Sequence, residues 1–151
     1  MEKPNVLLIE DNDGDAELVQ DLLHKAFKCI TIYHVNNIQK AKEIARKQHD
    51  INVILLDISL ADSAGLENIK TVHDLFAHVP IIVLTAVDSE TLSLSAVQSI
   101  VQDYLIKSQV TYKTLARTIM YSVKTHHTFK KINVSSESQK KFFNTHDILT
   151  R

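Results

Sequence analysis

The sequence predicts an α/β fold, in which a doubly wound, five-stranded parallel sheet carries helices on both faces. Short apolar runs alternate with segments of helical spacing five times along the chain. Several of these runs contain only apolar residues before their polar end, which is typical of strands covered by helices on both faces. Four of the runs also end in a polar residue, which would gather polar groups at one edge of the sheet.

The first half of the chain predicts three strands with two helices between them. The strands are expected at 5–9, 30–35 and 53–57. A turn at 12–15 supplies helix N-cap residues, and a helix follows it with inward positions at Ala16, Val19, Leu22, Leu23, Ala26 and Phe27. Asn36 and Asn37 cap a second, mostly polar helix, with apolar positions at Ile38, Ala41, Ile44 and Ala45.

The second half predicts two more strands and three helices. A loop at 59–65 leads into a helix with inward positions at Leu66, Ile69, Val72 and Phe76. Pro80 opens the fourth strand, where its missing N–H does least harm. Asp88 caps a helix to about residue 100, and a fifth strand is expected at 102–106. Thr111 starts the final helix, with Leu115, Ala116, Ile119, Met120 and Val123 on one face.

The polar strand ends supply the chemistry of the chain. With the flavodoxin-like strand order 2-1-3-4-5, Glu10, Asp11, Asp57 and Thr85 would be neighbours, and Lys107 would reach them from the fifth strand. Three carboxylates packed together repel one another, which raises a pKa or recruits a cation, and Mg²⁺ suits such an oxygen-rich site. An aspartate in this setting can act as a nucleophile toward a phosphoryl group.

Composition excludes several other classes of function. The 151 residues suffice for one domain and a tail, and a net charge of −1 argues against nucleic-acid or membrane surfaces. No apolar run approaches a membrane span, and the first residues lack a signal-peptide apolar region. Cys29 is the only cysteine, which fits a reducing cytoplasm. The eight histidines show no zinc-ligand spacing.

Several separate motifs carry a family resemblance. They are VLLIEDN at 6–12, ILLDISL at 54–60, DSAGLE at 62–67, PIIVLTA at 80–86 and QDYLIK at 102–107. On these motifs, residues 5–127 resemble the receiver domain of two-component response regulators, the CheY-like family. The resemblance implies a phosphorylation-activated signalling switch rather than an enzyme, with at most slow self-dephosphorylation.

The resemblance also implies a role for each polar residue. Asp57 would be the phosphoacceptor, and Mg²⁺ would be bound by Asp11, Asp57 and the backbone carbonyl of Ser59, with Glu10 completing the acidic pocket. Thr85 would be the hydroxyl that moves onto the phosphoryl group, Lys107 its salt-bridge partner, and Tyr104 the aromatic residue whose rotamer follows.

The resemblance further implies partners. The phosphoryl donor would be a sensor histidine kinase or a phosphotransfer protein. Phosphorylation would shift the surface formed by the helix at 88–100, the fifth strand and the final helix, and this surface would control a partner or output domain. Homodimerisation through these two helices is also a family property.

The main departures from the family pattern lie on either side of the fifth strand. Ile100 and Val101 stand where receivers usually carry Gly-Ala, and β-branched residues do not adopt positive φ cheaply, so this turn is expected to be reshaped. Ser108 stands where a proline, often after a cis bond, usually follows the lysine. We expect either a trans bond with an altered loop or a strained site at this position.

The sequence after residue 128 predicts a segment separate from the receiver domain. We divide the chain into a receiver domain at 1–128 and a helical tail or linker at 129–151, with a break at 133–136 after the final helix. The last six residues, HDILTR at 146–151, resemble the opening of GGDEF diguanylate cyclase domains. This favours a chain cut at that boundary, or a gene product without the output domain. The alternative is a free amphipathic tail.

Three other classes of function remain as alternatives. A phosphatase of the haloacid dehalogenase type needs a second acid two residues after its nucleophile, where Ser59 stands here. An FMN-binding flavodoxin needs a phosphate loop, and the acidic segment at 12–15 would repel the phosphate. The strongest rival is a receiver-like interaction scaffold that is never phosphorylated.

Overall fold

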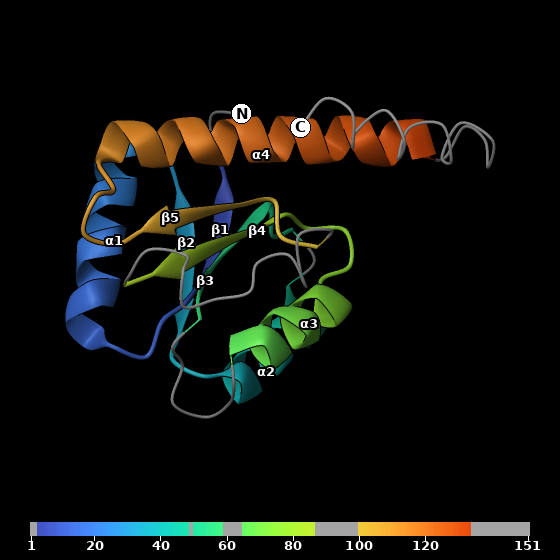
Figure 1. Cartoon of the computed structure of the whole chain (residues 1–151), viewed down its shortest axis with the longest axis horizontal. Helices are drawn as coiled ribbons and strands as arrows, with labels where there is room; N and C mark the ends of the chain where they lie inside the picture. Colours follow the sequence, from blue (N-terminus) through green and yellow to red (C-terminus); the bar gives the residue numbers. More distant parts are fainter. Residues whose placement is uncertain (1–2, 49, 59–64, 87–99, 134–151) are drawn as a thin grey trace.

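The computed structural model describes residues 3–48, 50–58, 65–86 and 100–133, and within these ranges it has nine regular elements (Figure 1). They are β1 (Asn5–Ile9), α1 (Asp13–Ala26), β2 (Thr31–Val35), α2 (Ile38–Lys47), β3 (Val53–Asp57), α3 (Gly65–Leu75), β4 (Ile81–Thr85), β5 (Asp103–Ile106) and α4 (Tyr112–Asn133). The loop predicted at 59–65, except Gly65, which begins α3, and nearly all of the helix predicted at 88–100 lie outside the described residues.

The five strands form one parallel sheet. Their order is β2-β1-β3-β4-β5, which confirms the predicted doubly wound topology. Along the sheet, Ile9 pairs with Leu56, Asp57 pairs with Leu84, and Thr85 pairs with Ile106. The carboxyl ends of β1, β3, β4 and β5 therefore lie at the same edge.

Two separate cores cover the two faces of this sheet. Figure 1 shows α1 and α4 packed together on one side, and α2 with α3 on the other. Successive side chains of a strand point to opposite faces, so the strands supply both cores. In β1, Val6 and Leu8 pack with α1 and α4, whereas Leu7 and Ile9 pack with α2 and α3. All four are fully buried, which explains the unbroken apolar run.

Asparagine caps begin the first two helices as the sequence predicts. The Oδ1 atom of Asn12 accepts a hydrogen bond from the backbone N–H of Asp15 at 2.8 Å. The Oδ1 atom of Asn37 does the same for the N–H of Lys40, also at 2.8 Å. Each cap satisfies a donor that the first turn of a helix would otherwise leave free, and so fixes where the helix starts.

The final helix differs from its predicted face. It begins at Tyr112, with the Thr111 hydroxyl accepting from the backbone N–H of Thr114 at 3.2 Å. Leu115 and Ile119 are buried as expected, but the prediction for Met120 is wrong, because 48% of that residue is exposed. Ser122 is buried in its place. The buried line follows steps of four and three residues, which is one stripe of an α-helix.

Smaller differences concern the ends of elements. β2 begins at Thr31 and β5 at Asp103, one residue later in each case than the sequence predicts. Neither Ile100 nor Val101 has a positive φ, and the Lys107–Ser108 bond is trans, since the described residues hold no cis peptide bond. The turn before β5 is thus built without the glycine conformation that this position usually allows.

The helix α4 continues without interruption to Asn133, past residue 128, where the sequence suggested a domain boundary. The division into a receiver and a tail remains a prediction.

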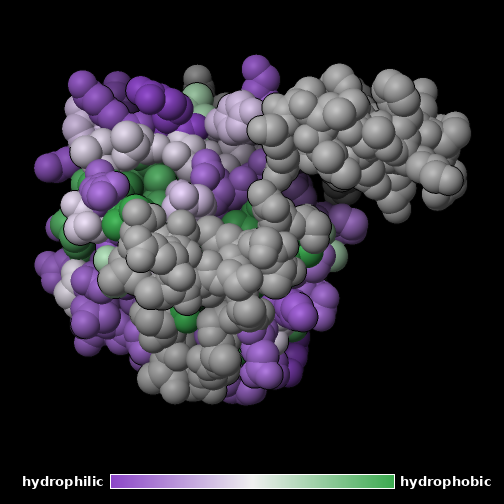
Figure 2. Space-filling view, in the orientation of Figure 1, coloured by the Kyte–Doolittle hydropathy of each residue, from purple (hydrophilic) through white to green (hydrophobic). Residues whose placement is uncertain are grey.

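On the face seen in Figure 2, the described residues are hydrophilic around the periphery, and hydrophobic residues show mainly in the middle. Among the described helices, none combines the length and the apolar character that a membrane span needs.

Candidate functional site

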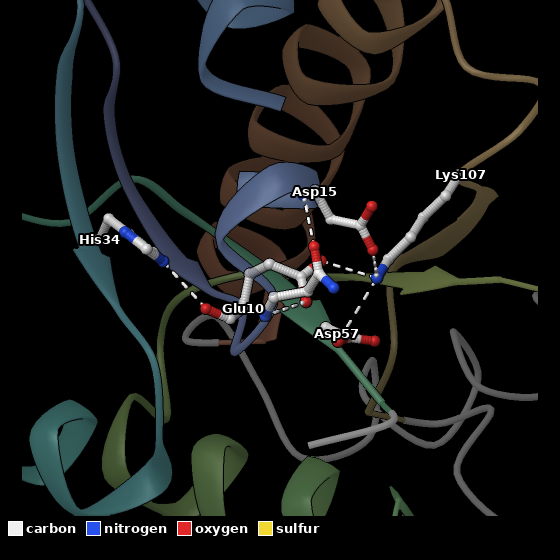
Figure 3. Close-up of polar contacts among 6 residues, drawn as sticks. Glu10, Asp15, His34, Asp57 and Lys107 are labelled. Carbon is white, nitrogen blue, oxygen red and sulfur yellow. Dashed lines mark hydrogen bonds and ion pairs between the residues drawn. The ribbon is translucent and has the colours of Figure 1, made fainter. Parts of the chain in front are cut away.

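Three charged residues from separate strands meet at the carboxyl edge of the sheet (Figure 3). Glu10 directly follows β1, Asp57 is the last residue of β3, and Lys107 directly follows β5. The Nζ atom of Lys107 lies 2.7 Å from Oε1 of Glu10 and 3.4 Å from Oδ2 of Asp57. The strand order brings them together, because β1 and β3 are neighbours and β4 alone separates β3 from β5.

Asp11 completes an acidic cluster at this edge. Glu10, Asp11 and Asp57 each offer a carboxylate oxygen, and these oxygens all lie within 4.8 Å of one another. Glu10 is fully buried and Asp57 is 1% exposed, whereas Asp11 is partly exposed. Carboxylate oxygens at this separation are suitable ligands for a hard divalent cation, and Asp11 leaves the cluster open to solvent on one side.

Burial and mutual repulsion set the electrostatics of the cluster. Burial raises the pKa of Glu10 from 4.5 to about 7, and the adjacent Asp57 carboxylate adds to this, against a lowering by Lys107. Burial by itself lowers the pKa of Lys107, but the carboxylates of Glu10, Asp15 and Asp57 outweigh it, so this pKa is raised above its ordinary value. Lys107 therefore stays protonated, and its single positive charge is not enough to neutralise the surrounding carboxylates.

Thr85 and Tyr104 lie on the opposite face of the sheet from Leu84 and Leu105. Thr85 ends β4 and is 6% exposed, and Tyr104 pairs with Val83, two residues before Thr85. Val83 packs in the α2–α3 core, whereas Leu84 and Leu105 pack with α1 and α4. Because residues two apart in a strand share a face, Tyr104 and Thr85 are on the same side of the sheet. Tyr104 is 39% exposed.

Two residues that the sequence reasoning did not assign to the site belong to it. The Oδ2 atom of Asp15, in the first turn of α1, accepts a hydrogen bond from Nζ of Lys107 at 2.9 Å. The imidazole Nε2 of His34, on β2, donates to the backbone carbonyl of Glu10 at 2.9 Å. The position of Asp15 in the first turn of a helix that follows directly on the first strand and its acidic end is a signal that could have indicated it. No sequence signal pointed to His34.

One predicted metal ligand lies outside the described residues. It is the backbone carbonyl of Ser59, which the resemblance assigns to the metal. The other predicted site residues all lie at the carboxyl edge of the sheet or, for Tyr104, two residues from it.

The geometry of the acidic cluster agrees with the protein family that the sequence matches. The model of the response regulator receiver domain matches residues 6–119, which is most of the chain. The chain belongs to the response regulator receiver domain family. Receiver domains are the signalling domains of two-component systems that a histidine kinase phosphorylates on an aspartate. Their role is signal transfer rather than that of an ordinary enzyme.

Curated relatives agree with this assignment. The chain is 36% identical over 84 residues to the polar-differentiation response regulator DivK of Brucella anthropi, covering 54% of this chain and 66% of DivK. It is 26% identical over 106 residues to the transcriptional regulatory protein ZraR of Klebsiella oxytoca, covering 70% of this chain and 23% of ZraR. The chain thus spans about a quarter of the length of ZraR.

Solved structures share the fold. The receiver domain of a sensor histidine kinase from Pseudomonas aeruginosa PAO1 superimposes with a TM-score of 0.68 at 23% identity, over 81% of this chain and 98% of that domain. That structure holds a magnesium ion coordinated in its active site cleft.

Proposed function

We propose that Asp57 is the residue of this receiver domain that accepts the phosphoryl group. The observation that carries the proposal is the position of its carboxylate, which is 1% exposed, ends β3 and lies 3.4 Å from the Lys107 ammonium. An Asp57 oxygen would form the bond to phosphorus while the P–N bond of a phosphohistidine breaks. The electron pair of that bond stays with the imidazole, which then takes up a proton. Lys107 offsets charge on the phosphoryl oxygens.

The same residues fit a Mg²⁺ ion. Glu10, Asp11 and Asp57 offer three carboxyl groups against the single positive charge of Lys107, and burial together with the adjacent Asp57 carboxylate raises the pKa of Glu10. We assign Asp11, Asp57 and the backbone carbonyl of Ser59 as ligands, with Glu10 completing the pocket. A bound Mg²⁺ would supply charge neutralisation for phosphoryl transfer. The exclusively oxygen donor set supports this ion over softer metals.

Thr85 and Tyr104 would convert phosphorylation into a change of surface. A phosphoryl group on Asp57 brings about −1.5 to −2 charges and new acceptor oxygens, by analogy with phosphoesters. The Thr85 hydroxyl would donate to one of these oxygens. Tyr104 lies on the same face and is 39% exposed, and its ring would turn inward into the space that Thr85 vacates. This would bias two surface states of β5 and its flanking helices.

The partners we propose follow from this chemistry. The donor is a sensor histidine kinase or a phosphotransfer protein, acting in the cytoplasm. We expect no direct contact with nucleic acid or membrane. The resemblance of the segment at 146–151 to the opening of GGDEF domains supports a diguanylate cyclase as the output domain. Homodimerisation would use α4 together with the helix predicted at 88–100, which lies outside the described residues.

The test is phosphorylation by a small donor. The full chain is incubated with acetyl phosphate and Mg²⁺, and intact mass is read for wild type, Asp57→Asn and Asp74→Asn, whose aspartate lies exposed on α3. Wild type and Asp74→Asn should gain one phosphoryl group, and Asp57→Asn none. A folded wild-type chain that gains no mass would refute the proposal and leave the interaction scaffold as the better description.

A further inference from the structure

Asp15 makes a contact to the site that phosphoryl transfer itself does not require. Its Oδ2 atom accepts a hydrogen bond from Nζ of Lys107 at 2.9 Å, although the two residues are 92 positions apart in the sequence. Figure 3 shows Lys107 extending from the end of β5 so that its ammonium lies between Asp15 on one side and Glu10 with Asp57 on the other. The ion pair therefore joins the start of α1 to the end of β5.

Local structure holds the Asp15 carboxylate in this place. The Asn12 cap accepts from the backbone N–H of Asp15 at 2.8 Å, which fixes the first turn of α1. The Asp15 side chain is 44% exposed, while that of Lys107 is 13% exposed and that of Glu10 is fully buried. Asp15 thus meets the ammonium from the solvent side, and Glu10 meets it from the core side.

Three carboxylates share the Lys107 ammonium at unequal distances. The Nζ atom of Lys107 lies 2.9 Å from Asp15 but 3.4 Å from Asp57, the proposed phosphoacceptor. An ammonium has three N–H donors, and three carboxylates surround this one. A phosphoryl group on Asp57 would add charge on that side and draw the ammonium away from Asp15.

We propose that Asp15 is a positioning residue that holds the Lys107 ammonium in the unphosphorylated state and competes for it with the phosphoryl group on Asp57. The inference rests on the proposed function of Asp57. Asp15 makes the phosphorylated state less stable than it would otherwise be, because the Lys107–Asp15 pair must loosen when the phosphoryl group takes the ammonium. It also leaves the acidic cluster more negative beforehand, because it shares the charge that would otherwise neutralise Glu10 and Asp57.

Removal of the Asp15 charge should therefore change two affinities in opposite directions. In Asp15→Asn, the full charge of Lys107 acts on Glu10 and Asp57, so the metal site is less negative and Mg²⁺ should bind more weakly. Without its competitor, Lys107 is free to contact a phosphoryl mimic, so beryllofluoride should bind more tightly at saturating Mg²⁺. Each change should be about fivefold, the size expected for a partly exposed ion pair. A purely structural role for Asp15 would not weaken the binding of Mg²⁺ while it strengthens the binding of beryllofluoride.

The experiment compares four full-length chains: wild type, Asp15→Asn, Asp15→Glu and Asp13→Asn. Asp13 is the matched control, since it is the other acidic residue of the same helical turn and is exposed. Mg²⁺ affinity is measured by calorimetry and beryllofluoride affinity by fluorine NMR, with thermal unfolding as a check on folding. Asp15→Asn should show both shifts, and Asp13→Asn neither. Asp15→Glu keeps the charge and should remain near wild type.

The outcomes separate the two proposals. A folded wild-type chain that binds no beryllofluoride overturns the assignment of Asp57 and this inference together. A wild-type chain that binds it, with Asp15→Asn matching Asp13→Asn in both affinities, overturns the role of Asp15 alone. The same holds if Asp15→Asn lowers only the unfolding temperature, or if both affinities move in the same direction.

Discussion

The backbone N–H of Lys107 donates a hydrogen bond to the backbone carbonyl of Thr85 at 2.8 Å. The two residues assigned to the phosphoryl oxygens are therefore joined through the main chain of β4 and β5, where Thr85 also pairs with Ile106. Since this bond extends the ladder of the sheet, we expect a response to phosphorylation to involve mainly side chains and the loops that follow.

Replacement of Thr85 should uncouple Tyr104 from the phosphoryl site. Thr85→Val keeps the β-branched shape and the fold but lacks the donor that would move onto a phosphoryl oxygen. With fluorotyrosine incorporated at the four tyrosines, the Tyr104 signal is identified by its loss in Tyr104→Phe. Beryllofluoride and Mg²⁺ should shift this signal in wild type and much less in Thr85→Val at saturation. An equal shift in both would show that the ring does not follow the hydroxyl.

Removal of the Lys107 charge should destabilise the metal-free protein. Lys107→Met leaves the fully buried Glu10 and the nearly buried Asp57 without their cation, which typically costs about 3 kcal/mol in free energy of unfolding. Denaturant unfolding in EDTA measures this loss, and added Mg²⁺ should recover part of it. Lys113→Met is the control, because Lys113 is exposed and its ammonium lies 6.0 Å from the Tyr112 ring centre. It should change stability little.

Glu10 should make the metal-free protein more stable in mild acid. Its pKa in the fold is raised from 4.5 to about 7, so the folded chain binds this proton more tightly than the unfolded chain. The stabilisation is complete below the lower of these pKa values and is lost as the pH rises through the upper one. In EDTA, wild type should gain stability from about pH 8 to about pH 6 relative to Glu10→Gln, which cannot titrate.

The matching measurement uses the metal. Mg²⁺ needs the ionised carboxylate, so it should raise the unfolding temperature more at about pH 8 than at about pH 6. A wild-type chain whose pH dependence of unfolding parallels that of Glu10→Gln would contradict the assigned titration of Glu10.

Ser122→Ala should stabilise the fold. Ser122 is fully buried in α4, and its hydroxyl oxygen has no hydrogen-bond partner among the residues that the structure describes. A buried hydroxyl without a partner carries a desolvation cost that alanine removes, and alanine is also the better helix former. We expect a gain of about 1 kcal/mol in free energy of unfolding, measured by denaturant titration. A loss of stability would mean that this hydroxyl has a partner in solution.

The fold follows from local patterns more completely than the site does. The run at 53–57 predicts a strand covered on both faces, and β3 has those bounds, because burial on both faces requires apolar residues at every position. The buried face of α4 follows less directly from the sequence, since Met120 and Ser122 border the same stripe. Packing against α1 and the sheet, rather than hydropathy, determines which of the two is buried.

The contacts of Lys107 show which parts of the site the sequence predicts and which it does not. Glu10 follows β1 and Asp57 ends the neighbouring β3, so the strand order alone brings them close. Asp15 belongs to a helix, and whether its carboxylate reaches the ammonium depends on how α1 sits over the end of β5. The His34 contact depends on the β1–β2 register in the same way. Such relations arise from tertiary packing, which no spacing within one segment specifies.

The unbroken course of α4 would enlarge any tilt of the helix. From Ser122, the last buried residue of α4 whose side chain is described, to Asn133 the helix advances about 17 Å, at 1.5 Å for each residue. A rotation of about 10° about Ser122 would carry the backbone of Asn133 through roughly 3 Å. If phosphorylation tilts α4, the length of the helix beyond the core would by itself increase the displacement at its end.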